Sequence, residues 1–274
     1  LGKHANAAML IDIARAHSEP LLVMAFGAGD LPDGVIALQP KAAQPLGAEE
    51  TRRLQAAYKA ATPHPDDTAF IVFTSGTSAA PKAIPRSHAF LTAQHHAIAP
   101  LLTSPTAERD LVAFPVFVLI NIASGRTSVL PNWKMSQLAR LAPDTLADWI
   151  TSQNVTRALI PPSLCDKLAK TEIPPALHTV FTGGGPVFPC TLSRLRAASP
   201  DLNVTCVYGS TEAEPIAHLN GMTISAQDAQ AMQSGHGLLV GHPVPDIAVR
   251  IVTDEIQVAG KHVNGGYLNP ADDA

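Results

Sequence analysis

The chain has 274 residues, of which 46% are hydrophobic and 15% are charged, and its formal net charge is −4 at pH 7. This composition is typical of a folded protein with a sizeable core and excludes an intrinsically disordered chain. The length allows one large domain or two smaller ones. The sequence has no basic patch and no apolar run of membrane-spanning length, which argues against a nucleic-acid partner and against a transmembrane segment.

The three cysteines, Cys165, Cys190 and Cys206, show no paired spacing. An odd number of cysteines without such spacing is typical of free thiols in a reducing compartment. We therefore expect a cytoplasmic protein.

Short apolar runs alternate with helical patterns along the chain. The apolar runs predict strands at residues 21–26, 69–73, 111–114, 127–130, 157–160, 179–181 and 204–207. The helical patterns cover residues 7–16, 48–60, 88–102, 144–152, 162–170 and 189–198. Continuous apolar runs suit strands that are covered on both faces, so the alternation predicts an α/β fold with largely parallel sheets.

The pattern changes after Pro215. Helical periodicity fades, and short strands are predicted at residues 237–240, 247–252 and 255–258, between glycines and prolines. Closely spaced short strands of this kind are typical of a small barrel-like unit.

A loop rich in small and hydroxyl residues follows the strand at 69–73 and leads to Pro81 and Lys82. Small side chains allow backbone N–H groups to converge on an anion. Hydroxyl groups and one glycine supply further donors and close approach, at Thr74, Ser75, Gly76, Thr77 and Ser78. Because Lys82 adds a positive charge, the loop is a candidate site for the phosphates of a nucleotide. The alternative is a polar turn between a strand and a helix.

A second motif, Tyr208-Gly209-Ser210-Thr211-Glu212, ends the strand at 204–207. Tyr208 offers a flat face on which an adenine can stack, and Gly209 lets the backbone approach the base or ribose. Thr211 can donate to an α-phosphate, and Glu212 is a hard oxygen ligand suited to Mg²⁺. The alternative is a helix cap, which Pro215 disfavours.

A third motif, Gly183-Gly184-Gly185-Pro186, follows the strand at 179–181. A glycine triplet by itself is most often a plain turn.

These three motifs, in this order, resemble those of the adenylate-forming superfamily, which includes acyl-CoA synthetases, adenylation domains of peptide synthetases and luciferases. The family's Thr-Ser-Gly-Thr-Thr-Gly-x-Pro-Lys-Gly loop is matched at residues 74–83, except that Ser78, Ala79 and Ala83 replace a threonine and two glycines. Alanine is costly wherever the backbone needs a positive φ, so the two alanines could weaken ATP binding. Residues 208–212 match the family's Tyr-Gly-x-Thr-Glu, and residues 183–186 resemble its Gly-Gly-Ala-Pro turn, which flanks the adenine and borders the acyl pocket.

Weaker similarity continues toward the C-terminus. Residues 241–245 resemble Gly-Arg-Pro-x-Pro, and residues 254–267 resemble a Gly-Glu-Ile-x-Val-x-Gly segment followed by Gly-Tyr. The resemblance is most specific from about residue 67 to residue 267.

The resemblance implies two packed αβ subdomains with largely parallel sheets plus a small distorted β-barrel. We expect residues 1–100 to form an incomplete first subdomain with the phosphate loop at 74–83. Residues 101–212 would form the second, with the adenine and acyl site, and residues 213–274 the barrel portion. It also implies that this is the N-terminal-domain part of a longer protein. The C-terminal lid domain, with its catalytic lysine, and the hinge region, with a ribose-binding aspartate and an arginine, would lie outside it.

The resemblance implies activation of a carboxylic acid by ATP, with Mg²⁺, through an acyl-adenylate. Lys82, Thr211 and Glu212 would be the catalytic residues, and Glu212 would also bind the metal. The acyl group would then pass to CoA, to a carrier-protein thiol or to an internal β-hydroxyl that closes a β-lactone. Two alternatives stay open: an ATP- or AMP-binding protein of the same fold without ligase activity, and an unrelated α/β binding module.

The acid substrate is expected to be apolar. Residues 114–126 correspond to the segment that borders the acyl site, and they make Phe117, Val118 and Asn121 candidate pocket residues. No carboxylate occurs between Asp110 and Asp144, and an ammonium group buried without a counter-charge is costly. The alternative is that this segment is helix core. Together with Gly-Lys-x-x-Asn at residues 2–6, the segment is similar to the β-lactone synthetases of olefin biosynthesis and related fatty-acyl activating enzymes.

Overall fold

The computed structural model describes residues 23–26, 35–38, 47–60, 63–74 and 81–273. The chain divides into two compact units, residues 1–62 and 63–274. In the first unit, strand β1 (Val23–Phe26) pairs in parallel with β2 (Val35–Leu38), and helix α2 (Ala48–Ala60) follows. The predicted helix at 7–16 and the motif at residues 2–6 lie outside the described residues.

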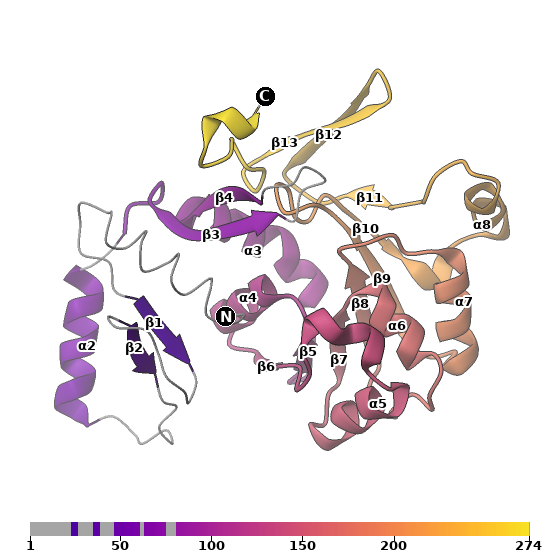
Figure 1. Cartoon of the computed structure of the whole chain (residues 1–274), viewed down its shortest axis with the longest axis horizontal. Helices are drawn as coiled ribbons and strands as arrows, with labels where there is room; N and C mark the ends of the chain where they lie inside the picture. The colour runs from indigo at the N-terminus through magenta and orange to yellow at the C-terminus, as the bar shows by residue number, and fades with distance from the viewer. Residues whose placement is uncertain (1–22, 27–34, 39–46, 61–62, 75–80, 274) are drawn as a thin grey trace. The chain divides into compact units, whose positions relative to one another are not determined.

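A seven-stranded sheet with the order β11-β10-β9-β8-β7-β5-β6 is the centre of the second unit (Figure 1). Strands β5 to β9 are parallel, and β10 and β11 extend the sheet in antiparallel fashion beyond β9. The strand bounds are β5 (Arg109–Val112), β6 (Thr127–Val129), β7 (Arg157–Ile160), β8 (Thr179–Gly183), β9 (Asn203–Tyr208), β10 (Ala217–Asn220) and β11 (His242–Pro243).

Two antiparallel hairpins complete the strands of this unit. They are formed by β3 (Thr68–Thr74) with β4 (Lys82–Ser87), and by β12 (Ile247–Val252) with β13 (Glu255–Gly260).

The helices of the second unit begin at local sequence signals. Ser87 caps α3 by accepting a hydrogen bond from the Phe90 N–H. Four other helices carry proline in their first turn, where a missing N–H costs nothing. The helix bounds are α3 (His88–Leu102), α4 (Pro115–Ala123), α5 (Pro143–Ser152), α6 (Pro162–Leu168), α7 (Pro189–Ala198) and α8 (Ala226–Gln233), with short 3₁₀ turns η1 (Met135–Arg140), η2 (Gly221–Thr223) and η3 (Pro270–Asp273).

Helices cover both faces of the parallel sheet, which is why β5, β7 and β8 are buried along almost their whole length. Side chains alternate between the faces along each strand. In β7, Ala158 and Ile160 join the core under α5, α6 and α7, whereas Leu159 joins the core under α3 and α4. Figure 1 shows α6 and α7 on one side of these strands and α3 and α4 on the other. None of the helices in the described part of the chain is long and apolar enough to span a bilayer.

The C-terminal region differs from its prediction. Strands β10 and β11, which follow residue 212, belong to the main sheet. Among the described residues, β12 and β13 pair only with each other, so residues 247–260 form a two-stranded hairpin and not part of a closed barrel. Residues 237–240 are not a strand, and Gly237 adopts a φ of 91°. Helix α8, which buries none of its side chains, was not predicted.

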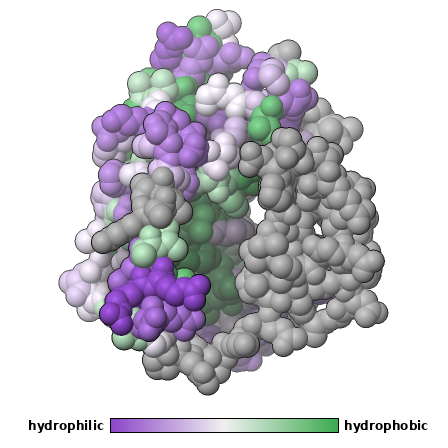
Figure 2. Space-filling model, turned by 90° about the vertical axis from the view of Figure 1, so that its left-hand side faces the viewer, coloured by the Kyte–Doolittle hydropathy of each residue, from purple (hydrophilic) through white to green (hydrophobic). Residues whose placement is uncertain are grey.

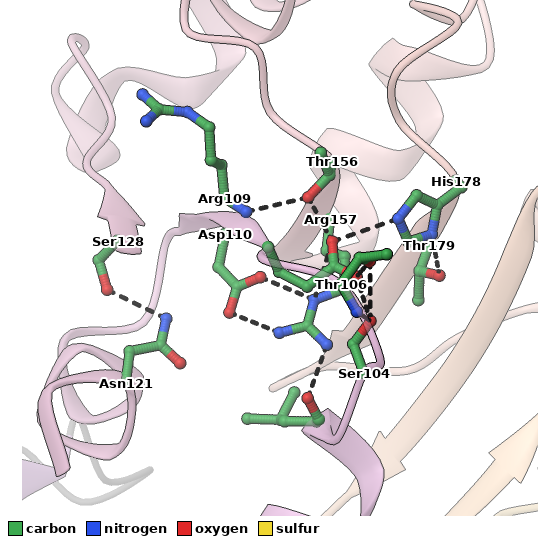
Figure 3. A network of polar contacts seen from close by, with 12 residues as sticks. Ser104, Thr106, Arg109, Asp110, Asn121, Ser128, Thr156, Arg157, His178 and Thr179 are labelled. Carbon is green, nitrogen blue, oxygen red and sulfur yellow. Dashed lines mark hydrogen bonds and ion pairs between the residues drawn. The ribbon is translucent and has the colours of Figure 1, made fainter. Parts of the chain in front are cut away.

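A buried polar network lies at the start of strands β5 and β7 (Figure 3). Asp110 and Arg157 are register partners on the two strands, and Arg157 donates two hydrogen bonds to the Asp110 carboxylate, at 2.7 and 2.9 Å. A third Arg157 donor bonds to the carbonyl of Leu102 at 2.8 Å. This bidentate pair fixes the charge of Arg157 in the interior, where an unpaired charge would be costly.

The surface of the described residues is mixed in polarity. Figure 2 shows one region of the viewed face where hydrophobic residues gather among hydrophilic ones. Apolar side chains with high exposure include Phe73 on β3, which is 62% exposed, and Ile251 on β12, which is 74% exposed.

Candidate active site

A cavity of about 910 Å³ lies in the second unit, between the β3–β4 hairpin and the carboxyl ends of the parallel strands. Ligands in open α/β sheets bind at this edge. The lining combines apolar side chains from several segments with polar side chains from the β3–β4 hairpin, from the loop after β9 and from Tyr267. The described lining consists of Phe70, Val72, Thr74, Lys82, Arg86, Phe114, Pro115, Val116, Phe117, Leu159, Phe181, Thr182, Gly183, Gly184, Val207, Gly209, Ser210, Thr211, Glu212, Glu214 and Tyr267.

The β3–β4 hairpin forms one wall of the cavity. Its register pairs Thr74 with Lys82 and Phe70 with Arg86. Because side chains alternate along a strand, Lys82 and Arg86, four residues apart, project to the same face. The hairpin therefore presents two cations to one cavity.

Two glycines, Gly183 and Gly184, line the cavity where β8 ends. Gly183 pairs with Val207 of β9, and a Cβ on Gly183 would lie 2.3 Å from the Val207 carbonyl oxygen. Gly184 has a φ of 70°, in the left-handed region that favours glycine. The close approach of Val207 therefore leaves no room for a side chain at position 183.

Glu212, Tyr267 and Lys82 meet at one side of the cavity. The Tyr267 hydroxyl donates a hydrogen bond of 2.8 Å to Glu212 Oε1. The Lys82 ammonium lies 4.6 Å from the centre of the Tyr267 ring and donates to the carbonyl of Asp272 at 2.6 Å. A carboxylate, a phenol and a cation from three distant segments thus form one polar cluster.

Glu212 is held in its ionised form. Burial acts to raise the pKa of its carboxyl, but the hydrogen bond from Tyr267, a further bond from Ser210 and the charge of Arg86 together lower it. The same Tyr267–Glu212 bond raises the pKa of the tyrosine. A carboxylate that stays charged beside a cavity is suited to bind a cation.

Arg86 and Glu214 form a second charged pair in the lining. The Arg86 side chain is 1% exposed, and its Nη2 lies 3.9 Å from Glu214 Oε2. Burial raises the pKa of Glu214, and the charge of Arg86 opposes this shift. Arg86 Nη2 also donates to the carbonyl of Thr211 at 2.7 Å.

The structure brings together most of the predicted site residues that it describes. Those in the cavity lining are Thr74, Lys82, Phe117, Gly183, Gly184, Gly209, Ser210, Thr211 and Glu212. The loop residues Ser75, Gly76, Thr77 and Ser78 lie outside the described residues.

Five predicted residues are not part of the described lining, namely Gly185, Pro186, Tyr208, Val118 and Asn121. Tyr208 is partly buried and packs against Ala213, Ile216 and Ala217. Asn121 is fully buried and donates to the Ser128 hydroxyl at 3.0 Å (Figure 3).

The lining residues that the sequence analysis gave no role include Arg86, Glu214 and Tyr267. Arg86 follows Lys82 at a spacing of four, which places both on one face once residues 82–87 are recognised as a strand. Glu214 lies outside residues 110–144, the window in which the sequence has no carboxylate. The cavity therefore contains a carboxylate that faces a buried arginine.

The cavity residues fit a Mg²⁺ ion that is bound mainly by the phosphates of a substrate and only in part by the protein. Within the described ranges, no group of three or more His, Cys, Asp and Glu side chains is arranged to bind a metal. Mg²⁺ is commonly held by one or two carboxylates together with substrate phosphates, and the ionised Glu212 meets that requirement.

Residues 3–268 match the family model described as AMP-binding enzyme. The chain belongs to the AMP-binding enzyme family. The family segment thus includes the hairpin, the glycine turn and the loop after β9, which together form the cavity.

Curated relatives are between 24% and 33% identical to the chain over the aligned residues. Olefin beta-lactone synthetase of Xanthomonas campestris is 33% identical over 189 residues, covering 68% of this chain and 34% of the relative. The protein of the same name from Stenotrophomonas maltophilia is 32% identical over 226 residues, covering 74% and 41%. The chain therefore spans about a third to two fifths of the length of these curated relatives.

Solved structures show the same fold. O-succinylbenzoate coenzyme A synthetase of Bacillus subtilis, solved in complex with ATP and magnesium ion, matches with a TM-score of 0.61 at 22% identity. The match covers 76% of this chain and 44% of that protein. The predicted α/β architecture with its mainly parallel sheet is confirmed.

Proposed function

We propose that the protein activates a carboxylic acid with ATP, giving an acyl-adenylate and pyrophosphate. The observation that carries this proposal is that Lys82 and Glu212, from distant parts of the chain, line one cavity together with an apolar surface. Membership of the AMP-binding enzyme family and the lactone and CoA synthetases among the relatives support it.

In the proposed reaction, a carboxylate oxygen of the acid attacks the α-phosphorus of ATP. The bond from the α-phosphorus to the bridging oxygen breaks, and pyrophosphate leaves with that electron pair. Two anionic groups must meet, so positioning and charge neutralisation provide most of the catalysis. Lys82 is the cation for the β- and γ-phosphates, and the phosphates would replace its contact with the Asp272 carbonyl.

Thr211 and Glu212 would act at the α-phosphate. The Thr211 side chain donates to a phosphate oxygen and orients it for attack. Glu212 would hold Mg²⁺, which supplies charge neutralisation when bound. The Tyr267 hydroxyl donates a 2.8 Å hydrogen bond to Glu212, which favours the ionised carboxylate and fixes its orientation. Gly183 and Gly184 would lie against the adenine, because both line the cavity where β8 ends.

The acid would be apolar over most of its length. Four phenylalanine side chains, Phe70, Phe114, Phe117 and Phe181, line the cavity together with aliphatic ones. Glu214 faces Arg86 at 3.9 Å, so its charge already has a counter-ion inside the protein. A fatty acid or β-hydroxy fatty acid meets these conditions, and the lactone synthetases among the relatives favour the second.

The adenylate would pass to the thiol of CoA or of an acyl-carrier protein, or an internal β-hydroxyl would close a β-lactone. In each case a nucleophilic oxygen or sulfur attacks the acyl carbon and AMP leaves. The partners of the protein are therefore a small carboxylic acid and, for the first two routes, a thiol acceptor.

Acid-dependent exchange of labelled pyrophosphate into ATP tests the proposal with the intact protein that carries this chain. Exchange that requires a fatty or β-hydroxy fatty acid supports it. Binding of ATP or AMP without exchange, across acids of different length and polarity, would identify a nucleotide-binding protein without ligase activity.

A further inference from the structure

Arg86 is buried at the junction between the β3–β4 hairpin and the loop that carries Glu212. Its Nη2 donates to the Thr211 carbonyl at 2.7 Å, and its side chain is 1% exposed. Its Nη1 reaches Gln94 Oε1 at 3.5 Å, and its Nε has no hydrogen-bond partner among the described residues. A cation in so buried a place is costly, so its remaining contacts must offset that cost.

A second contact holds the loop on the C-terminal side of Glu212. Gln94 of α3 donates from Nε2 to the Glu214 carbonyl at 3.0 Å. The Glu214 carboxylate lies 3.9 Å from Arg86 Nη2. Arg86 and Gln94 therefore connect residues 211 and 214, and Glu212 lies between the two points of attachment.

Backbone hydrogen bonds hold the rest of the loop. Ser210 and Ala213 exchange hydrogen bonds of 2.9 and 3.1 Å between their backbone groups, and the Asn264 N–H donates to the Glu212 carbonyl at 2.7 Å. These bonds set the shape of the turn. Among the described contacts of residues 211–214, those of Arg86 and Gln94 connect the turn to β4 and α3, the strand and the helix that carry these two residues.

We propose that Arg86 is a positioning residue for the adenylation site, which holds residues 211–214 against the β3–β4 hairpin so that Glu212 faces the same ligand as Lys82. This inference rests on the proposed function, because it assigns Glu212 to the metal-bound nucleotide. In this proposal Arg86 acts through the Thr211 carbonyl, because its buried guanidinium already bonds to protein groups. Residues that orient metal ligands commonly change metal affinity or activity by about 10- to 100-fold when they are replaced.

The first measurement is hydrogen–deuterium exchange on Arg86→Met, Arg86→Lys and wild-type protein. Arg109→Met is the matched control, because Arg109 also donates to a backbone carbonyl, that of Gln153 at 2.7 Å, but is exposed and outside the cavity lining. We expect faster uptake in peptides covering residues 209–216 in Arg86→Met, partial restoration in Arg86→Lys, and no change there in Arg109→Met. Unchanged uptake at 209–216, or an equal rise over the whole chain, would overturn the proposal.

The second measurement is the Mg²⁺ dependence of acid-dependent pyrophosphate exchange. In Arg86→Met we expect the half-saturating Mg²⁺ concentration to rise about tenfold or more. Arg86→Lys should recover part of this loss, because lysine can still donate to the Thr211 carbonyl. A variant that is less stable but keeps the wild-type Mg²⁺ response would show a purely structural role and would overturn the proposal.

The two measurements separate this inference from the proposed function. If the intact wild-type protein gives no exchange with any acid, the proposed function fails, whereas the deuterium readout still decides whether Arg86 holds the loop. Glu214→Gln adds a check, since it removes the ion pair and leaves the bond from Arg86 to Thr211 in place. A smaller rise in uptake than in Arg86→Met is expected.

Discussion

Tyr267 and Glu212, which are far apart in the sequence, are joined by a hydrogen bond of 2.8 Å from the tyrosine hydroxyl to Glu212 Oε1. This bond makes a tyrosine near the end of the chain part of the candidate site. It also links the Glu212 carboxylate to Lys82, because the lysine ammonium lies 4.6 Å from the centre of the same ring.

Replacing Tyr267 by phenylalanine removes the hydroxyl and keeps the ring. The pKa of Glu212 is lowered in part by this bond, so it should rise in Tyr267→Phe. Because the ionised carboxylate then forms only at higher pH, the acidic limb of the pH–activity profile should move to higher pH. The measurement is pyrophosphate exchange from about pH 3 to pH 7 at fixed Mg²⁺, a range that covers the ordinary pKa of a glutamate, about 4.3, and the values below it. An unshifted acidic limb would show that the bond does not control Glu212.

Lys82→Met should lower kcat/KM for ATP by about 100-fold or more, since it removes the cation that we propose for the β- and γ-phosphates. The fold should survive, because the aliphatic part of the side chain is preserved. Lys170→Met, on an exposed residue outside the cavity lining, is the control. Equal activity of the two variants in steady-state exchange assays would exclude a role for Lys82 in binding phosphates.

Gly183→Ala should destabilise the protein. The added Cβ would lie 2.3 Å from the Val207 carbonyl oxygen, so β8 and β9 must separate locally, which we expect to cost about 1–3 kcal/mol. Urea unfolding followed by circular dichroism measures this loss. Gly185→Ala is the neighbouring control, since nothing lies within 4 Å of its added Cβ. A loss in Gly185→Ala as large as that in Gly183→Ala would contradict the steric argument.

The free energy of unfolding should depend on pH in the acidic range because of Glu108. Burial acts to raise the pKa of its carboxyl, but hydrogen bonds from Ser104, Thr156 and Thr106 and the charge of Arg157 lower it to about 2 (Figure 3). Because the folded-state pKa is depressed, the stabilisation is present above the unfolded pKa and is lost as pH falls from about 4.5 to about 2. A shift of this size corresponds to at most about 3 kcal/mol.

Glu108→Gln tests this expectation. The variant should be less stable than wild type at pH 7, and the difference should shrink as the pH approaches 2, where the wild-type carboxyl becomes neutral as well. Urea midpoints at pH 7, 5 and 3 give the comparison, and Glu172→Gln, on an exposed residue, serves as the reference variant. A constant difference between wild type and Glu108→Gln across this range would show that Glu108 does not titrate as inferred.

Strands were predictable where burial is continuous along the chain. The runs that became β5, β7, β8 and β9 are apolar because helices cover both of their faces. Strand β4 gave no such signal, since Lys82, Pro85 and Arg86 interrupt its apolar residues. Its alternation places the charged residues toward the cavity, so the strand became recognisable only with its partner β3 in place.

The motifs of the site were predictable from the sequence, but the contacts between its distant segments were not. Lys82, Thr211 and Glu212 stood out because each motif is short and local. Arg86, Glu214 and Tyr267 did not, because their roles depend on contacts between segments distant in the sequence. The placement of Tyr208 against Ala213 and Ile216 likewise depends on the turn that brings β10 back beside β9.

The amino-acid sequence by itself determined the alternating strands and helices, the phosphate-loop and Thr211-Glu212 motifs and the family to which they belong, because each of these is encoded in neighbouring residues. Only the tertiary structure decided that β10 and β11 extend the main sheet, that Lys82 and Glu212 share one cavity, and that Arg86 is bonded to the loop after β9. The physical reason is that burial patterns and turn preferences act over a few residues, whereas a buried charge finds its partner through packing of the whole unit.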